Sequence, residues 1–96
     1  MPRDCAVRVR ISGRVQGVWY RAWTENRARD HCLDGWVRNC SDGTVEAVFA
    51  GPEPQVERMI ERCHEGPPTA SVDHIERESV DAGPLIGQGF RKLPTY

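Results

Sequence analysis

The chain has 96 residues, a length that suits one domain with a single modest core. Hydrophobic residues make up 39% and charged residues 28%, as in ordinary soluble globular proteins. The 13 basic and 14 acidic residues leave a net charge of −1, so no overall positive field attracts nucleic acid. We therefore predict a single domain over residues 1–96, with its core at about 7–90, in which any anion site is local.

The N-terminal residues lack the apolar stretch of a secretory signal, and no run approaches the ~20 apolar residues that span a bilayer. We expect a cytoplasmic monomer without a membrane or nucleic-acid partner. The cysteines show neither a Cys-x-x-Cys pair nor the ligand spacing of zinc motifs, so we expect free thiols rather than disulfides or a zinc site. We expect no metal and no cofactor. The four cysteines are Cys5, Cys32, Cys40 and Cys63.

The first half of the chain predicts a strand, a helix and a hairpin. Apolar and polar residues alternate over 7–11, which is typical of a half-buried strand. A loop over 13–17 follows, and a helix is expected from about residue 20 to 31. The hairpin joins strands at 35–39 and 44–50 through an Asp-Gly turn. The residues expected on the inner helix face are Thr24, Ala28 and Cys32, and those expected on one strand face are Val45, Ala47 and Phe49.

The second half predicts another helix and further strands. Prolines 52 and 54 suit the start of the helix, and the Gly-Pro-Pro run at 66–68 stops it. A fourth strand is expected within 72–80, followed by a loop over 83–89 and a short last strand over 90–93. The amphipathic stripe of the helix consists of Val56, Met59, Ile60 and Cys63.

This order of elements is the split βαβ pattern, which predicts an α+β fold, a ferredoxin-like βαββαβ sandwich. Two helices would cover one face of an antiparallel sheet, and the last segment would add a short fifth strand. Right-handed crossovers make strands one and two parallel, with strand three between them. The loop 13–20, Asn39 and Thr44 would then meet at one edge of the sheet.

The loop at this edge has the features of an anion site. The main-chain N–H groups of residues 15–20 and of the helix start can form a cradle, and Gly17 permits the positive φ that turns them inward. Arg21 in the first helical turn lies at the unfavourable end of the helix dipole unless an anion binds there. Arginine holds phosphate through two N–H bonds. The alternatives are a tight structural turn and a solvated surface arginine.

Asn39 is the second candidate for a functional side chain. An amide at a strand end can hold a water by donating and accepting at once, and Thr44 could hydrogen-bond to it across the hairpin. The alternatives are a turn-initiating asparagine and an ordinary β-branched strand residue. Glu46 is expected to be a solvated strand residue, with an exposed general base as the alternative. Trp23 and Trp36 are expected to be packing aromatics, with a place at the rim of the site as the alternative.

Two long blocks of the chain stand out as motifs. They are the segment 13–21, Gly-Arg-Val-Gln-Gly-Val-Trp-Tyr-Arg, and the segment 35–46, Gly-Trp-Val-Arg-Asn-Cys-Ser-Asp-Gly-Thr-Val-Glu. The first resembles the signature of the acylphosphatase family, the second resembles the second block of that family, and 66–72 resembles a third. The resemblance runs from about Val7 to Phe90 and implies the ferredoxin-like sandwich independently of the residue patterns.

The resemblance implies an enzyme that hydrolyses acyl phosphates to a carboxylate and phosphate without a metal. It implies that Arg21 and the loop amides bind phosphate and that Asn39 positions the attacking water. Tyr20 stands where the family usually has phenylalanine, and we expect little effect because the ring is kept. Neither block holds an obvious general base, so we expect catalysis to need no histidine. The loop residues concerned are Val15, Gln16, Gly17, Val18, Trp19 and Tyr20.

Two other functions fit the same fold. RNA-binding domains of this fold stack bases on aromatic residues of the sheet, but the expected Gly-Phe-Gly-Phe-type strand is missing from this sequence. A non-catalytic phosphate-binding domain would keep the cradle. Fold alone does not separate such a domain from an enzyme, whereas turnover does.

Overall fold

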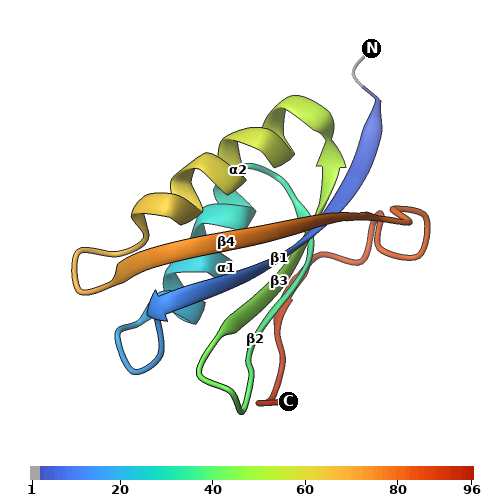
Figure 1. The fold of residues 1–96 in the computed structure, drawn as a ribbon. Coiled ribbons are helices and arrows are strands. Elements are labelled where there is room, and N and C mark those ends of the chain that lie inside the picture. Colours follow the sequence, from blue (N-terminus) through green and yellow to red (C-terminus); the bar gives the residue numbers. More distant parts are fainter. Residues whose placement is uncertain (1–2) are drawn as a thin grey trace.

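Two helices cover one face of a five-stranded sheet in the computed structural model, which describes residues 3–96 (Figure 1). The order of elements is the predicted βαββαβ order followed by a short fifth strand. The strands are β1 (Asp4–Arg14), β2 (Asp34–Asn39), β3 (Val45–Pro52), β4 (Ser71–Val80) and β5 (Phe90–Lys92), and the helices are α1 (Tyr20–Asp30) and α2 (Glu53–Glu65). The ferredoxin-like fold is therefore confirmed.

The strands lie in the order β4-β1-β3-β2-β5. Because β3 is antiparallel to both β1 and β2, these two strands run parallel on either side of it, as predicted. The predicted short fifth strand is present, and its pairing departs from the antiparallel arrangement of the rest of the sheet. β5 pairs with β2 in parallel, from Gly35 opposite Phe90 to Val37 opposite Lys92, because the connection after β4 crosses to the far edge of the sheet.

The main core lies between the helices and the sheet. All four residues of the predicted α2 stripe are buried, and so are the alternate residues of β1 and β3. In α1, Thr24 and Ala28 are buried, and the Thr24 hydroxyl donates to the Tyr20 carbonyl at 2.8 Å, which satisfies this polar group. Cys32 was the wrong residue for this face. It is exposed and has a φ of 57° because the helix has already ended at Asp30.

The second face of the sheet is partly covered as well. Ala6, Val48 and Ala50 form a small second core, against which Trp36, Ala82 and Leu85 pack. The segment 81–89 supplies two of these covering residues and is fixed to the start of β2 by hydrogen bonds from the Gly87 and Gly89 amides to the Asp34 carboxylate. Trp23 packs against the main core, so both tryptophans are packing residues, as predicted.

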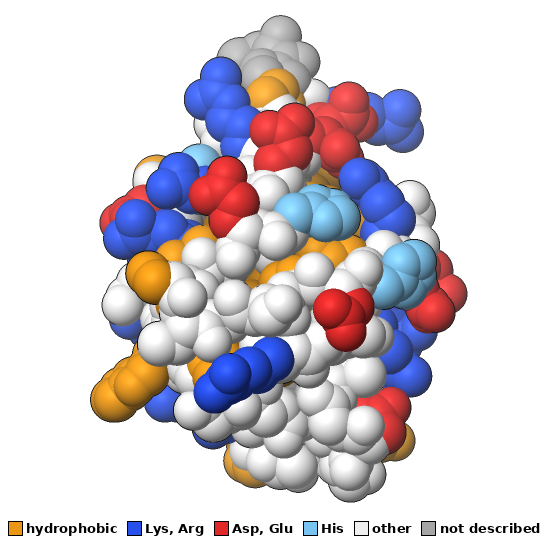
Figure 2. All heavy atoms as spheres, turned by 60° about the vertical axis from the view of Figure 1, so that its left-hand side comes forward, with side chains coloured by type: hydrophobic (Ala, Val, Ile, Leu, Met, Phe, Trp, Pro, Cys, Tyr) orange, Lys and Arg blue, Asp and Glu red, His pale blue; other side chains and the backbone are white. Residues whose placement is uncertain are grey.

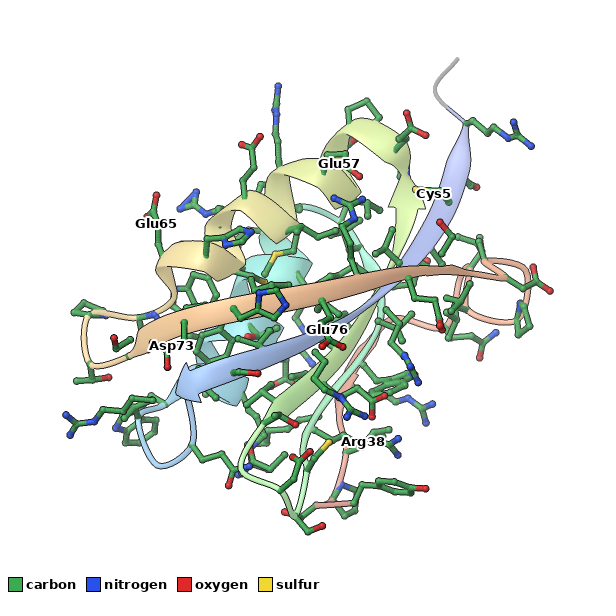
Figure 3. All side chains as sticks on the ribbon, in the orientation of Figure 1. Cys5, Arg38, Glu57, Glu65, Asp73 and Glu76 are labelled. Atoms are coloured by element: carbon green, nitrogen blue, oxygen red, sulfur yellow. The ribbon has the colours of Figure 1, made fainter. Side chains whose placement is uncertain are left out.

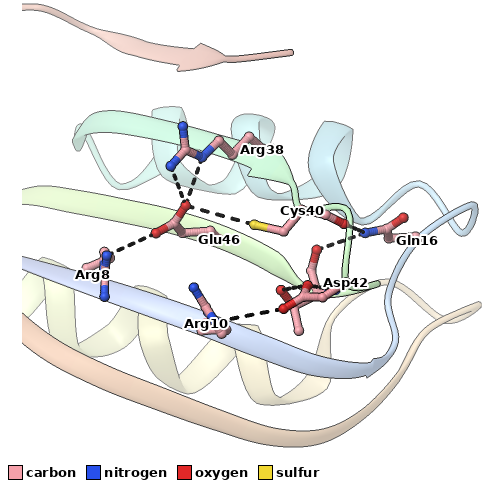
Figure 4. A network of polar contacts seen from close by, with 8 residues as sticks. Arg8, Arg10, Gln16, Arg38, Cys40, Asp42 and Glu46 are labelled. Carbon is pink, nitrogen blue, oxygen red and sulfur yellow. Dashed lines mark hydrogen bonds and ion pairs between the residues drawn. The ribbon is translucent and has the colours of Figure 1, made fainter. Parts of the chain in front are cut away.

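Glu46 lies on this second face, and the prediction of a solvated glutamate is wrong because its side chain is only 4% exposed. Figure 4 shows the arginines around it. Arg38 of β2 donates to Oε1 through Nε at 2.8 Å, and Arg8 of β1 contacts Oε2 at 3.2 Å. The guanidinium of Arg38 in turn stacks on Tyr96, 4.0 Å from the ring centroid. Glu46 thereby links three neighbouring strands.

Candidate active site

A cavity of about 380 Å³ opens where β1 ends, α1 begins and β2 ends, the edge at which the topology brings these segments together. The side of the molecule that carries the loop after β1 is turned forward in Figure 2, and acidic and basic side chains are interspersed on it. The cavity is lined by Val15, Gly17, Trp19, Tyr20, Arg21, Ala22, Asn39 and Lys92.

The loop 15–19 alternates buried and exposed residues. Val15 and Val18 are buried and fix the loop to the core, whereas Gly17 and Trp19 are exposed with φ angles of 71° and 69°. A Cβ on Gly17 would meet no atom within 4 Å, so there is room for a side chain at this position. Glycine is favoured there because it adopts a positive φ without strain. Left-handed residues in a turn are a feature of main-chain anion nests, and Gly17 and Trp19 supply two of them.

The N–H groups of this loop and of the helix start are unused. Within residues 3–96, the main-chain amides of residues 16–22 donate no hydrogen bond to another residue. The first hydrogen bond of α1 runs from the Trp23 amide to the Trp19 carbonyl at 3.0 Å. The helix dipole adds partial positive charge at the same place, so the loop and helix start are suited to an anion.

Two side chains tie the loop to other parts of the fold. Gln16 Nε2 donates to the carbonyls of Cys40 and Thr44, each at 2.8 Å, which ties the loop to the β2–β3 hairpin (Figure 4). The Thr69 hydroxyl donates to the Val18 carbonyl at 2.7 Å. From the sequence, Gln16 was expected to contribute its main-chain N–H and not its side chain. Thr69 was missed, although the segment 66–72 that contains it resembles a family block.

Two cations reach the cavity. Arg21 is partly buried and forms no ion pair with an acidic residue of the range 3–96. Lys92 comes from β5, which the pairing with β2 carries to the cavity. Lys92 was missed because the last strand was predicted without its partner, and its place in the site depends on that partner.

Asn39, the last residue of β2, presents a buried acceptor at the cavity. Its Oδ1 has no hydrogen-bond partner among the residues that the structure describes. Its main-chain carbonyl accepts from the Tyr96 amide at 2.9 Å, which holds this strand end to the segment after β5. A buried acceptor left unpaired costs roughly 1–3 kcal/mol, so Asn39 Oδ1 is suited to accept from a bound water or ligand.

Thr44 belongs to the hairpin turn and does not line the cavity. Its hydroxyl and its amide donate to Asp42 Oδ1 at 2.7 and 3.0 Å, where sequence reasoning placed a bond to Asn39. These two hydrogen bonds hold the pKa of Asp42 below its ordinary value. Thr44 reaches the loop only through its carbonyl, which accepts from Gln16.

Tyr20 directs its hydroxyl into the core. The hydroxyl donates to the carbonyl of Cys63 in the last turn of α2, and burial raises the pKa of the tyrosine. A Cβ on Gly66 would lie 2.7 Å from Tyr20 Cε2, so the residue that ends α2 has to be glycine to leave room for this ring.

A sequence profile described as acylphosphatase matches residues 7–92. The chain belongs to the acylphosphatase family. It is 51% identical over 94 residues to an acylphosphatase of Rhizorhabdus wittichii, which spans 98% of this chain and 93% of that protein. It is 58% identical over 87 residues to an acylphosphatase of Rhodospirillum rubrum, at 91% and 93% coverage. The chain is therefore a hydrolase of the acylphosphatase type.

The solved structure of an acylphosphatase from Coxiella burnetii has the same fold as this chain. Its TM-score is 0.87 at 33% sequence identity, and the match covers 94% of this chain and 93% of that one. In this chain, Arg21 and Asn39 line the same cavity as the loop, as the topology predicts. Of the six loop residues singled out from the sequence, Gln16 and Val18 do not line the cavity.

Proposed function

We propose that this acylphosphatase hydrolyses acyl phosphates without a metal, binding phosphate through the loop amides of residues 15–21 and Arg21 and positioning water with Asn39. The observation that carries the proposal is the set of unused amides at 16–22 beside a cavity that also holds a cation without an acidic partner and an unpaired amide oxygen. An anion and a water are the ligands that these three features require.

The phosphoryl group would lie in the loop, with its oxygens accepting from the main-chain amides. Arg21 would bind two of these oxygens through its planar guanidinium. Phosphoryl transfer depends chiefly on placement and on stabilisation of charge on the phosphoryl oxygens, which is what this set of donors supplies. Lys92 of β5 adds a second positive charge at the cavity.

Asn39 would hold the water that attacks phosphorus. Its Oδ1 accepts a hydrogen bond from the water, which fixes the position of the water before the reaction. The oxygen of the water forms the new bond to phosphorus as the bond from phosphorus to the acyl oxygen breaks. The electron pair leaves with the carboxylate, and the proton of the water passes to phosphate or solvent. A carboxylate has a conjugate-acid pKa of roughly 4, so the leaving group needs little help from a general acid.

Turnover of benzoyl phosphate in the presence of EDTA tests this proposal. We expect the wild-type protein to hydrolyse it and Asn39→Ala to lose at least about a hundredfold in kcat while still binding phosphate, measured by calorimetry. Arg21→Ala should lose both turnover and phosphate binding. A folded wild type that binds phosphate without turnover would be a binding domain, and activity that EDTA abolishes and Mg²⁺ restores would contradict the metal-free reaction.

We also propose that residues 1–96 act as one domain, as a cytoplasmic monomer that binds neither nucleic acid nor membranes. The net charge of −1 and the mixed charges of the face in Figure 2 support the absence of a nucleic-acid partner. Within residues 3–96, no helix is long and apolar enough to cross a bilayer. Light scattering of the purified protein and fractionation of cells test the oligomeric state and the location.

A further inference from the structure

Trp19 differs from most of the hydrophobic side chains in its exposure to solvent. It is 78% exposed, more than any other large hydrophobic residue of the range 3–96. The other two tryptophans, Trp23 and Trp36, pack against the two cores. Exposing an indole to water is unfavourable, so packing of the fold does not account for a tryptophan at this position.

The backbone gives no reason for a tryptophan either. Trp19 has a φ of 69° and a ψ of 15°, a left-handed conformation that is unfavourable for a bulky side chain. Gly17 adopts a similar φ two residues earlier without this penalty. Trp19 is also the N-cap of α1, yet its side chain makes no capping hydrogen bond. Glycine or asparagine would suit the position better on both counts.

Its location does offer a reason. Trp19 lines the same cavity as Arg21 and Asn39, together with the apolar residues Val15 and Ala22. The volume of about 380 Å³ falls in the range of roughly 300–1,000 Å³ that holds small-molecule ligands, so there is room for more than the phosphoryl group. The part of an acyl phosphate that extends from the loop amides is the acyl group.

We propose that Trp19 is a specificity-determining residue that packs against the acyl group, and that the site favours acyl phosphates with an aromatic acyl group over those with a small one. This inference rests on the proposed function. An aromatic ring gains from offset or edge-to-face packing on the indole, whereas an acetyl group is too small to cover it. The substitution of Trp19 removes only the side chain, because the residue would bind phosphate through its main-chain amide.

The ratio of kcat/KM for benzoyl phosphate to kcat/KM for acetyl phosphate tests this role. We expect Trp19→Gly to lower the value for benzoyl phosphate about five- to tenfold, mainly through KM, and the value for acetyl phosphate less than about twofold. Trp19→Phe should keep most of the preference because it keeps a ring. Ile86→Ala, which removes an exposed hydrophobic side chain outside the cavity lining, is the matched control and should leave the ratio unchanged.

Inhibition by two non-hydrolysable phosphonates, phenacylphosphonate and acetonylphosphonate, gives a readout that does not depend on turnover of the inhibitor. Binding of both should be measured by calorimetry as well. We expect the wild type to prefer the aromatic compound and Trp19→Gly to lose this preference. Equal losses for both compounds would overturn the inference and would mean that the Trp19 side chain supports phosphate binding and not binding of the acyl group. A wild type that turns over neither acyl phosphate would overturn the proposed function instead, and the phosphonate affinities would still decide the role of Trp19.

Discussion

The Tyr20 hydroxyl donates a hydrogen bond to the main-chain carbonyl of Cys63 over 2.5 Å, which joins the first residue of α1 to the last turn of α2. Carbonyls in the last turn of a helix have no partner within the helix, so this hydroxyl satisfies a buried acceptor that would otherwise be unpaired. The residue that follows the loop 15–19 is thereby fixed to the second helix.

Tyr20→Phe should therefore destabilise the protein by about 1 kcal/mol, because the Cys63 carbonyl loses its donor. We expect kcat to change less than about twofold, since the hydroxyl lies away from the loop amides. Urea unfolding of the two proteins measures the first effect. Tyr96→Phe, at an exposed tyrosine, is the matched control, and equal stability of Tyr20→Phe and the wild type would contradict the prediction.

Gln16→Ala should lower kcat/KM about tenfold with only about 1 kcal/mol of lost stability. The two carbonyls that Gln16 contacts keep main-chain partners, as Thr44 accepts from the Cys40 amide and Cys40 from the Gly43 amide. What is lost is the fixed distance between the loop 15–19 and the strand end that carries Asn39. Gln88→Ala at an exposed glutamine is the control, and an unchanged kcat/KM in Gln16→Ala would show that the loop needs no such brace.

Glu46→Gln should cost about 2–3 kcal/mol, although the residue was expected to be solvated. It leaves Arg38 partly buried without its negative partner, and the exposure of Arg8 keeps the cost below that of a fully buried pair. Thermal and urea unfolding measure the loss, and activity per folded molecule should be kept because Glu46 does not line the cavity. Glu76→Gln, at an exposed glutamate of β4, should have a much smaller effect.

The Glu57–Arg77 pair makes stability depend on pH at acid values. Figure 3 shows Glu57 on α2, at the same end of the molecule as Cys5. Hydrogen bonds from Arg77 lower the pKa of Glu57, so the pair stabilises the fold fully above the ordinary glutamate pKa and loses its effect as the pH falls through the lower folded value.

We therefore expect Glu57→Gln to be less stable than the wild type at pH 7 by at most about 1 kcal/mol, because both side chains are half exposed. At pH 3 the difference should shrink. Glu61→Gln on the exposed face of the same helix is the control. A difference that stays the same at both pH values would mean that Glu57 acts by packing and not by charge.

Replacing His31, His64 and His74 together by glutamine should change kcat/KM by less than about twofold, because none of the three lines the cavity. The pKa of His31 is lowered by its partial burial and by nearby Arg62, but this residue lies at the end of α1 that is far from the loop. A steep loss of activity in the folded triple variant would show that a histidine takes part in the reaction.

Local periodicity explains why much of the fold could be predicted. The alternation of Val7, Val9 and Ile11 and the stripe of α2 each record which side of an element faces the core, and the order of elements then fixes the topology. The meeting of Arg21 and Asn39 at one cavity follows from that topology, since both lie at the ends of elements on one sheet edge.

The features that could not be predicted depend on contacts between distant segments. Glu46 is buried beside Arg8 of β1 and Arg38 of β2, which lie on the neighbouring strands, and no local pattern reports these contacts. Lys92 reaches the cavity through the parallel pairing of β5 with β2. The side-chain contacts of Gln16 and Thr69 likewise join residues that lie 24 or more positions apart.

The cavity is lined by segments that lie far apart in the chain, and this has a consequence for refolding. These segments are the loop after β1, the end of β2 and the last strand, and the sheet that holds them pairs Ala6 with Val80 and Gly35 with Phe90. Pairings between segments so far apart in the chain form slowly compared with helices, whose contacts are local. After dilution from denaturant, this chain would therefore regain catalysis more slowly than a helical bundle of similar size regains its fold, because the site forms together with the sheet.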